Sequence, residues 1–165
     1  MPPYRLQVLL DMRIKAEDEA KDAFAAALKE AEAQKKQLVT MQQTLEKMKV
    51  ERKAKVQAFL MEMSSKGGGV SGFQQMGRFE QRLKDEEAQY ALDIERQKEV
   101  VTQAEKLVEQ RRAEMADAAK ERKAIEKNKE AFLKQVKTER QAKEEMNQEE
   151  IGAVLHLART RRENS

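Results

Sequence analysis

The sequence predicts an all-α protein in which two long antiparallel helices form a left-handed coiled-coil hairpin. Charged residues make up 38% of the chain and aromatic residues only 4%, so there is little material for a globular core. Apolar residues recur at alternating spacings of three and four, which is typical of a heptad repeat. Glycine is concentrated between two helix-forming stretches, because residues 64–72 hold four of the chain's six glycines.

The chain is expected to form a single hairpin with two helices, a hinge and a tail. The approximate bounds within residues 1–165 are 3–63 for the first helix, 64–72 for the glycine-rich hinge, 73–148 for the second helix and 149–165 for the tail. Pro2 and Pro3 suit the start of a helix, and Ser71 is a candidate N-cap for the second one. Gly152 and the polar end of the chain predict that the tail is frayed or that the helix breaks there.

Heptad positions define the apolar seam of each predicted helix. In the first helix the two series are Phe24, Ala31, Leu38, Leu45, Arg52, Phe59 and Ala20, Ala27, Gln34, Met41, Met48, Lys55. In the second helix the repeat persists through Leu83, Tyr90, Ile94, Val101, Val108, Met115, Ile125, Phe132 and Val136. Several positions are alanine or polar, so we expect a thin seam rather than a thick core.

The two seams can be aligned, because facing residue numbers in an antiparallel hairpin add up to a constant. The matched apolar pairs are Phe24 with Met115, Ala31 with Val108, Leu38 with Val101 and Leu45 with Ile94. Their common centre lies near Gly69, inside the predicted hinge. The same rule places Arg52 opposite Glu87 and Glu17 opposite Arg122, so charges that interrupt the seams can pair and fix the alignment.

Apolar side chains remain outside this seam near the two chain ends. The second helix has no residue of the first helix to face after about Val136, and its apolar residues beyond that point are Met146, Ile151, Val154, Leu155 and Leu157. The opening run over residues 6–14 is also denser in apolar residues than a coiled coil requires. We consider two interpretations: a frayed tail, or one docking end built from both segments.

The sequence predicts no catalytic, cofactor or metal site. It has no cysteine, and its only histidine, His156, has no neighbouring ligand set. The segment KGGGVSG lacks the order of a phosphate-binding loop, so we interpret it as a turn. The net charge of +3 is spread over mixed-sign helix faces, which does not favour nucleic-acid binding through Arg159, Arg161 and Arg162. No stretch is apolar enough to span a bilayer, so we expect a cytoplasmic protein without membrane insertion.

Three segments resemble the FliJ/YscO family of type III secretion and flagellar export proteins. They are YRLQVLLDMRIKAEDEAKDAF at the start, GFQQMGRFEQRL after the hinge, and KEEMNQEEIGAVLHLARTRR near the end. The family features are an aromatic-plus-leucine start followed by an acidic patch, and a Phe and a Leu four residues apart in the second helix. Here the latter are Phe79 and Leu83.

The resemblance implies a non-enzymatic central stalk that couples a hexameric export ATPase to the cytoplasmic part of the export gate. The end carrying both termini would dock on the ATPase, with Leu6, Leu9, Leu10, Ile14, Met146, Ile151 and Leu155 as candidates. The hinge half would meet the gate through Phe79, Leu83 and Tyr90, to which the alignment adds Arg52 and Val56. At Glu86 and Tyr90 the chain departs from the flagellar pattern of a small residue and a histidine.

The sequence leaves several alternatives open. The resemblance fits either a flagellar or an injectisome apparatus, and it adds export chaperones as a further class of partner. A hairpin that completes its own seam is expected to be a monomer when isolated. The competing function is a generic coiled-coil spacer or a chaperone-like protein, which would share the fold and the charge pattern.

Overall fold

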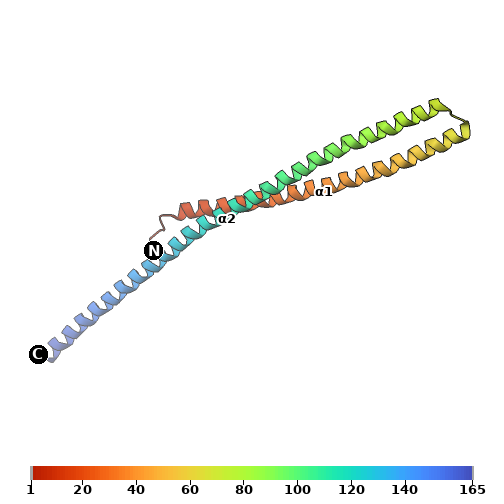
Figure 1. Ribbon diagram of the computed structural model, residues 1–165. Helices are drawn as coiled ribbons and strands as arrows, with labels where there is room; N and C mark the ends of the chain where they lie inside the picture. Colours follow the sequence, from red (N-terminus) through yellow and green to blue (C-terminus); the bar gives the residue numbers. More distant parts are fainter. Residues whose placement is uncertain (1, 165) are drawn as a thin grey trace. The chain divides into compact units, whose positions relative to one another are not determined.

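The computed structural model describes residues 2–164, which hold two α-helices and no strand. Helix α1 spans Gln7–Lys66 and helix α2 spans Val70–Glu163 (Figure 1). A short turn joins them, and the contacts between the helices are antiparallel. The predicted class of an all-α antiparallel hairpin is therefore confirmed.

The turn is shorter than the predicted hinge and is built around two glycines. Gly67 has a φ of 66°, the left-handed conformation that ends many helices because glycine lacks a Cβ. Its successor Gly68 donates a backbone hydrogen bond of 3.2 Å to the carbonyl of Met63, which closes the last turn of α1. The Gly69 carbonyl then accepts the bonds from Gly72 and Phe73 that open α2.

This geometry corrects the predicted start of the second helix. Gly69 occupies the N-cap position, so Ser71 already lies inside the helix and does not cap it. Helix α2 also includes Gly72, which was expected to lie in the hinge. A Cβ at Gly72 would come within 2.6 Å of the Met63 Cε atom, so the missing side chain makes room for Met63. Gly72 therefore serves packing between the helices rather than reversal of the chain.

The start of α1 lies four residues later than predicted. Residues 2–4 are not helical, and the backbone N–H of Gln7 bonds to the Tyr4 carbonyl at 3.2 Å, so the helix begins with that turn. The ring of Pro3 disfavours the helical conformation of Pro2, the residue before it. Tyr4 is held outside the helix by a ring contact with Phe132, whose centroid lies 5.2 Å away.

Helix α2 continues past the predicted limit at residue 148 to Glu163, and Gly152 does not break it. One glycine costs a helix only about 1 kcal/mol relative to alanine. The surrounding residues, rich in Leu, Ala, Glu and Arg, are good helix formers, so the predicted tail over 149–165 is helical through Glu163.

The contacts divide the chain into two compact units, of which one covers residues 21–113 and includes the turn. Its buried cluster consists of Ala27, Ala31 and Val108, with Phe24 and Ala104 packed against it. Further along the same helix pair, Ile94 and Val101 are also buried. Small side chains dominate this contact, which confirms the thin apolar seam predicted from the heptads.

The other unit combines residues 1–20 with residues 114–165. Its most buried side chains are Leu10 and Glu17, with exposed fractions of 4% and 5%. Arg122 donates hydrogen bonds to Glu17 and, at 2.6 Å, to Glu126. These two carboxylates raise the pKa of Arg122, Glu126 having the larger effect, so the arginine remains a cation. The predicted pairing of Glu17 with Arg122 is therefore confirmed.

Candidate protein-docking surfaces

The described residues, 2–164, hold no group of three acidic, histidine or cysteine side chains that could bind a metal ion. No helix within this range is long and apolar enough to cross a membrane. His156 is exposed on α2. Lys66 Nζ donates a 2.9 Å hydrogen bond to Glu62, which lowers the pKa of Glu62 and raises that of Lys66. Both groups are exposed in the last turn of α1, so the pair stabilises that helix end and does not form an enclosed catalytic site.

A nearly buried ion pair marks the hinge half of the hairpin. Arg52 Nε donates a 2.8 Å hydrogen bond to Glu87 Oε1, and a terminal nitrogen of Arg52 lies 3.8 Å from Glu80. The side chains of Arg52 and Glu87 are 16% and 11% exposed. The alignment predicted Glu87 as the partner of Arg52, but it did not identify the second carboxylate near Arg52, that of Glu80, one heptad before Glu87.

Arg52 and Leu83 line the same small surface groove, together with aliphatic and charged residues of both helices. The other lining residues are Met48, Glu51, Lys55, Glu86 and Glu87. Leu83 is half-buried, so part of its side chain remains available to a partner. The structure therefore brings together two of the five predicted gate-facing residues, with Glu86 at their edge.

Phe79 forms an aromatic contact nearer the turn. Its ring stacks against Phe59 of α1 at a centroid distance of 6.0 Å and an interplanar angle of 24°. The guanidinium carbon of Arg82 lies 5.5 Å from the centre of the Phe79 ring. Val56 and Tyr90, the remaining gate candidates, are half-buried. Phe59 was not selected as a candidate, although the rule that aligned the seams also pairs it with Phe79.

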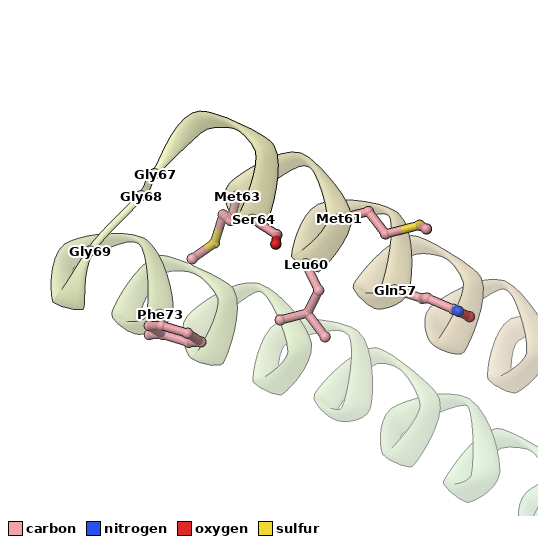
Figure 2. Close-up of a pocket in the computed structure, with 9 residues that line it drawn as sticks. All are labelled: Gln57, Leu60, Met61, Met63, Ser64, Gly67, Gly68, Gly69 and Phe73. Atoms are coloured by element: carbon pink, nitrogen blue, oxygen red, sulfur yellow. The ribbon is translucent and has the colours of Figure 1, made fainter.

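An open apolar pocket lies at the turn itself. Its lining residues are Gln57, Leu60, Met61, Met63, Ser64, Gly67, Gly68, Gly69 and Phe73. Figure 2 shows Leu60 directed from α1 toward α2, and Met63 directed toward the first turn of α2. Phe73 is 60% exposed and Met61 68% exposed. The glycines therefore do more than reverse the chain, since their bare backbone forms one wall of this pocket.

The run at the start of the chain divides between core and surface. Leu10 is buried and Leu9 is half-buried, whereas Leu6 and Ile14 are 41% and 39% exposed. As a candidate for direct ATPase contact, Leu10 is therefore corrected to a core residue. Extending the heptad of Phe24 backward by two repeats leads to Leu10, which explains its burial.

Two more exposed apolar residues, Val8 and Met12, lie within the same run and were not selected as candidates. Val8 and Met12 lie one helical turn apart, and each is two residues from the buried Leu10, so they occupy the outer side of α1. The signal was present in the sequence, because the run holds more apolar residues than one seam can use. Several polar contacts join this segment to α2, including a 2.6 Å bond from Arg13 to Glu121 and a 2.6 Å bond from Lys129 to Gln7.

The last part of α2 has no partner in α1. Val136 is the last half-buried residue, and every described residue after it is exposed. We call residues 137–163 the overhang. Its apolar residues Met146, Ile151, Val154, Leu155 and Leu157 have exposed fractions between 59% and 64%. The overhang begins where the alignment predicted, and it is helical through Glu163.

A family model described as YscO-like protein matches residues 1–162. Among solved structures, a YscO homolog from Chlamydia trachomatis is similar over 98% of this chain and 99% of its own, with a TM-score of 0.78 and 22% sequence identity. At this identity the likeness supports the fold alone. The search of curated proteins found no match.

Proposed function

Because the chain belongs to the YscO-like family of type III secretion-related proteins, we propose that it is a non-enzymatic stalk between an export ATPase and the export gate. The observation that supports this proposal is that each compact unit of the hairpin carries apolar side chains that are exposed or only half-buried. The overhang and the exposed side of residues 6–14 belong to one compact unit, and the surface around Arg52, Phe79 and Leu83 belongs to the other.

The first surface suits a hexameric ATPase. Nine apolar side chains at the chain ends are at least 39% exposed: Leu6, Val8, Met12, Ile14, Met146, Ile151, Val154, Leu155 and Leu157. Apolar side chains left exposed on an otherwise highly charged chain are typical of a protein-binding surface. The exposed candidates Leu6, Ile14, Met146, Ile151 and Leu155 supply contact area, whereas Leu10 holds α1 against α2.

The second surface suits the cytoplasmic part of the export gate. Phe79 and Leu83 lie one helical turn apart and are half-buried, so they combine a fixed position with an accessible edge. Arg82 adds a cation beside the Phe79 ring, and Glu86 adds a carboxylate beside Leu83. An aromatic and aliphatic centre with charged neighbours is the composition expected of a binding hot spot.

The same proposal applies to a flagellar and to an injectisome apparatus, and to a position at the cytoplasmic side of either. A generic spacer or chaperone-like hairpin is the second candidate function. The open pocket at the turn favours it, because Leu60, Met61 and Phe73 offer an apolar site that the stalk proposal does not use. Flexible methionines beside an apolar pocket suit an export chaperone or another client of variable shape.

ATP turnover by the cognate hexameric ATPase tests the stalk proposal. Addition of the folded chain should raise turnover or promote assembly of the ring. The variant Leu6→Ser/Ile14→Ser/Met146→Ser should weaken this effect with unchanged helicity. The matched control is Val39→Ser/Val50→Ser, which removes two exposed apolar side chains from the other unit and should leave the effect intact. Absence of binding at micromolar concentrations of both folded proteins would contradict the proposal.

A further inference from the structure

The overhang carries an apolar face that the hairpin seam does not use. Ile151, Val154, Leu155 and Ala158 are spaced by one, three and four residues, so they share one side of α2. Ile151 and Leu155 are each 60% exposed. Met146 lies on a different side, because it stands two heptads after Phe132 and continues the seam that faces α1.

Charges of opposite sign flank this apolar face in separate tracts. The acidic tract before it comprises Glu144, Glu145, Glu149 and Glu150, and the basic tract after it comprises Arg159, Arg161 and Arg162. Glu145 and Glu149 are four residues apart, and such like-charge neighbours repel each other along a helix. Neither Glu145 nor Arg159 forms an ion pair with any residue in the described range 2–164. Glu144 lies 3.5 Å from Arg140, and the overhang as a whole carries two tracts of opposite charge that are complementary to each other.

We propose that the overhangs of two copies of this chain pair side by side and antiparallel, with a twofold axis near Ala153. Ile151 and Leu155 lie two residues on either side of Ala153, so Ile151 of one copy packs against Leu155 of the other. Glu144 and Arg162 both lie nine residues from Ala153, and Glu145 and Arg161 both lie eight residues from it, so the start of each acidic tract meets the basic tract of the second copy. Such a pairing is isologous, because the same patch serves both copies and the assembly closes as a dimer.

The register is favourable for packing as well as for charge. Glu144, Gln148, Ile151, Leu155, Ala158 and Arg162 follow one another at spacings of four, three, four, three and four, which is the pattern of a coiled-coil seam. The segment from Glu144 to Arg162 is only about 28 Å long at the rise of an α-helix. We therefore infer an association in the micromolar range rather than a permanent dimer.

The expectation of a monomer rested on the hairpin completing its own seam, and the overhang lies outside that seam. Self-pairing would cover Ile151 and Leu155, two candidates for ATPase contact. If the proposed stalk function holds, a copy in the dimer is therefore prevented from docking, and the ATPase competes with the second copy. The dimer itself is independent of that function.

The first test is the mass of the purified full-length chain by sedimentation equilibrium from about 5 to about 500 µM. We expect the mean mass to rise from 19.0 kDa toward twice that value. Ile151→Ser/Leu155→Ser should weaken dimerisation at least about tenfold. Met146→Ser/Leu157→Ser is the matched control, because these residues are 60% and 59% exposed on the other side of the same helix. A chain that stays at 19.0 kDa throughout, or equal effects of the two variants, would overturn the proposal.

Charge reversal tests the antiparallel arrangement itself. Glu144→Arg/Glu145→Arg and Arg161→Glu/Arg162→Glu should each abolish self-association, since the facing pairs Glu144–Arg162 and Glu145–Arg161 both become repulsive. An equimolar mixture of the two variants should form a heterodimer, because each reversed tract then meets its complement. Circular dichroism checks that both variants remain helical. Failure of the mixture to associate while the unmodified chain does would contradict antiparallel pairing.

Discussion

Replacement of Arg52 by alanine tests whether the ion pair in the hinge half behaves as a buried pair. The substitution leaves Glu87, with a side chain only 11% exposed, without the cation that bonds to it at 2.8 Å. Removing one partner of a fully buried pair costs about 3–5 kcal/mol, whereas an exposed pair contributes about 0–1 kcal/mol. Residual exposure of both side chains places the expected loss in the free energy of unfolding at about 2–3 kcal/mol.

Urea unfolding followed by helical circular dichroism measures this loss. With a denaturant slope of about 2–3 kcal/mol per M, the midpoint of Arg52→Ala should fall by about 1 M. The double variant Arg52→Met/Glu87→Leu should recover to within about 1 kcal/mol of the unmodified chain, because neither charge is then left buried. Lys49→Ala is the control, since its 3.6 Å pair with Glu46 is exposed. An unchanged midpoint for Arg52→Ala, or a double variant as unstable as the single one, would refute this reasoning.

Three further predictions follow from single positions. Gly67→Ala should destabilise the hairpin by about 1 kcal/mol because φ is positive at Gly67. Gly152→Ala should instead stabilise α2 by about 0.5–1 kcal/mol in thermal unfolding at low protein concentration. Changes in stability of the same sign for both variants would contradict these assignments. The pKa of the Glu62 carboxyl, measured by NMR titration, should lie below its usual value of 4.5. The contact with Lys66 should therefore persist above pH 4.5 and be lost as the pH falls through the lowered pKa. A titration midpoint at or above 4.5 would contradict the pairing. Leu83→Ser should weaken binding to the cytoplasmic gate domain at least about tenfold in calorimetry, and the exposed control Leu92→Ser should not; equal losses would argue against the groove.

Much of the hairpin can be predicted because long-range contacts in a coiled coil repeat at fixed spacing. The heptads and the alignment identified the pairs Arg52–Glu87 and Glu17–Arg122, and the end of the paired region at Val136. Local backbone features were less predictable. The N-cap at Gly69 depends on the left-handed φ of Gly67, and composition alone does not show which of several adjacent glycines adopts it.

The candidate surfaces were predictable only where exposure follows from the repeat. The same heptads, extended toward the start of the chain, account for the burial of Leu10, and Val8 and Met12 are then exposed by exclusion. The pocket at the turn could not be predicted, because it depends on how Met63 fits against Gly72. The repeat separates the face of the overhang that continues the hairpin seam from the face around Ile151, but it does not indicate which of them binds a partner, since both are exposed.

If the chain is a stalk, one hairpin presents separate surfaces to the ATPase and to the export gate. Site-specific photo-crosslinking in the assembled apparatus tests it most directly, with the crosslinker placed in turn at Met146, at Phe79 and, as an exposed control, at Val39. The account predicts capture of the ATPase from Met146, of the gate from Phe79, and of neither from Val39. Capture of the same partner from Met146 and Phe79, or of no apparatus protein from either, would contradict it.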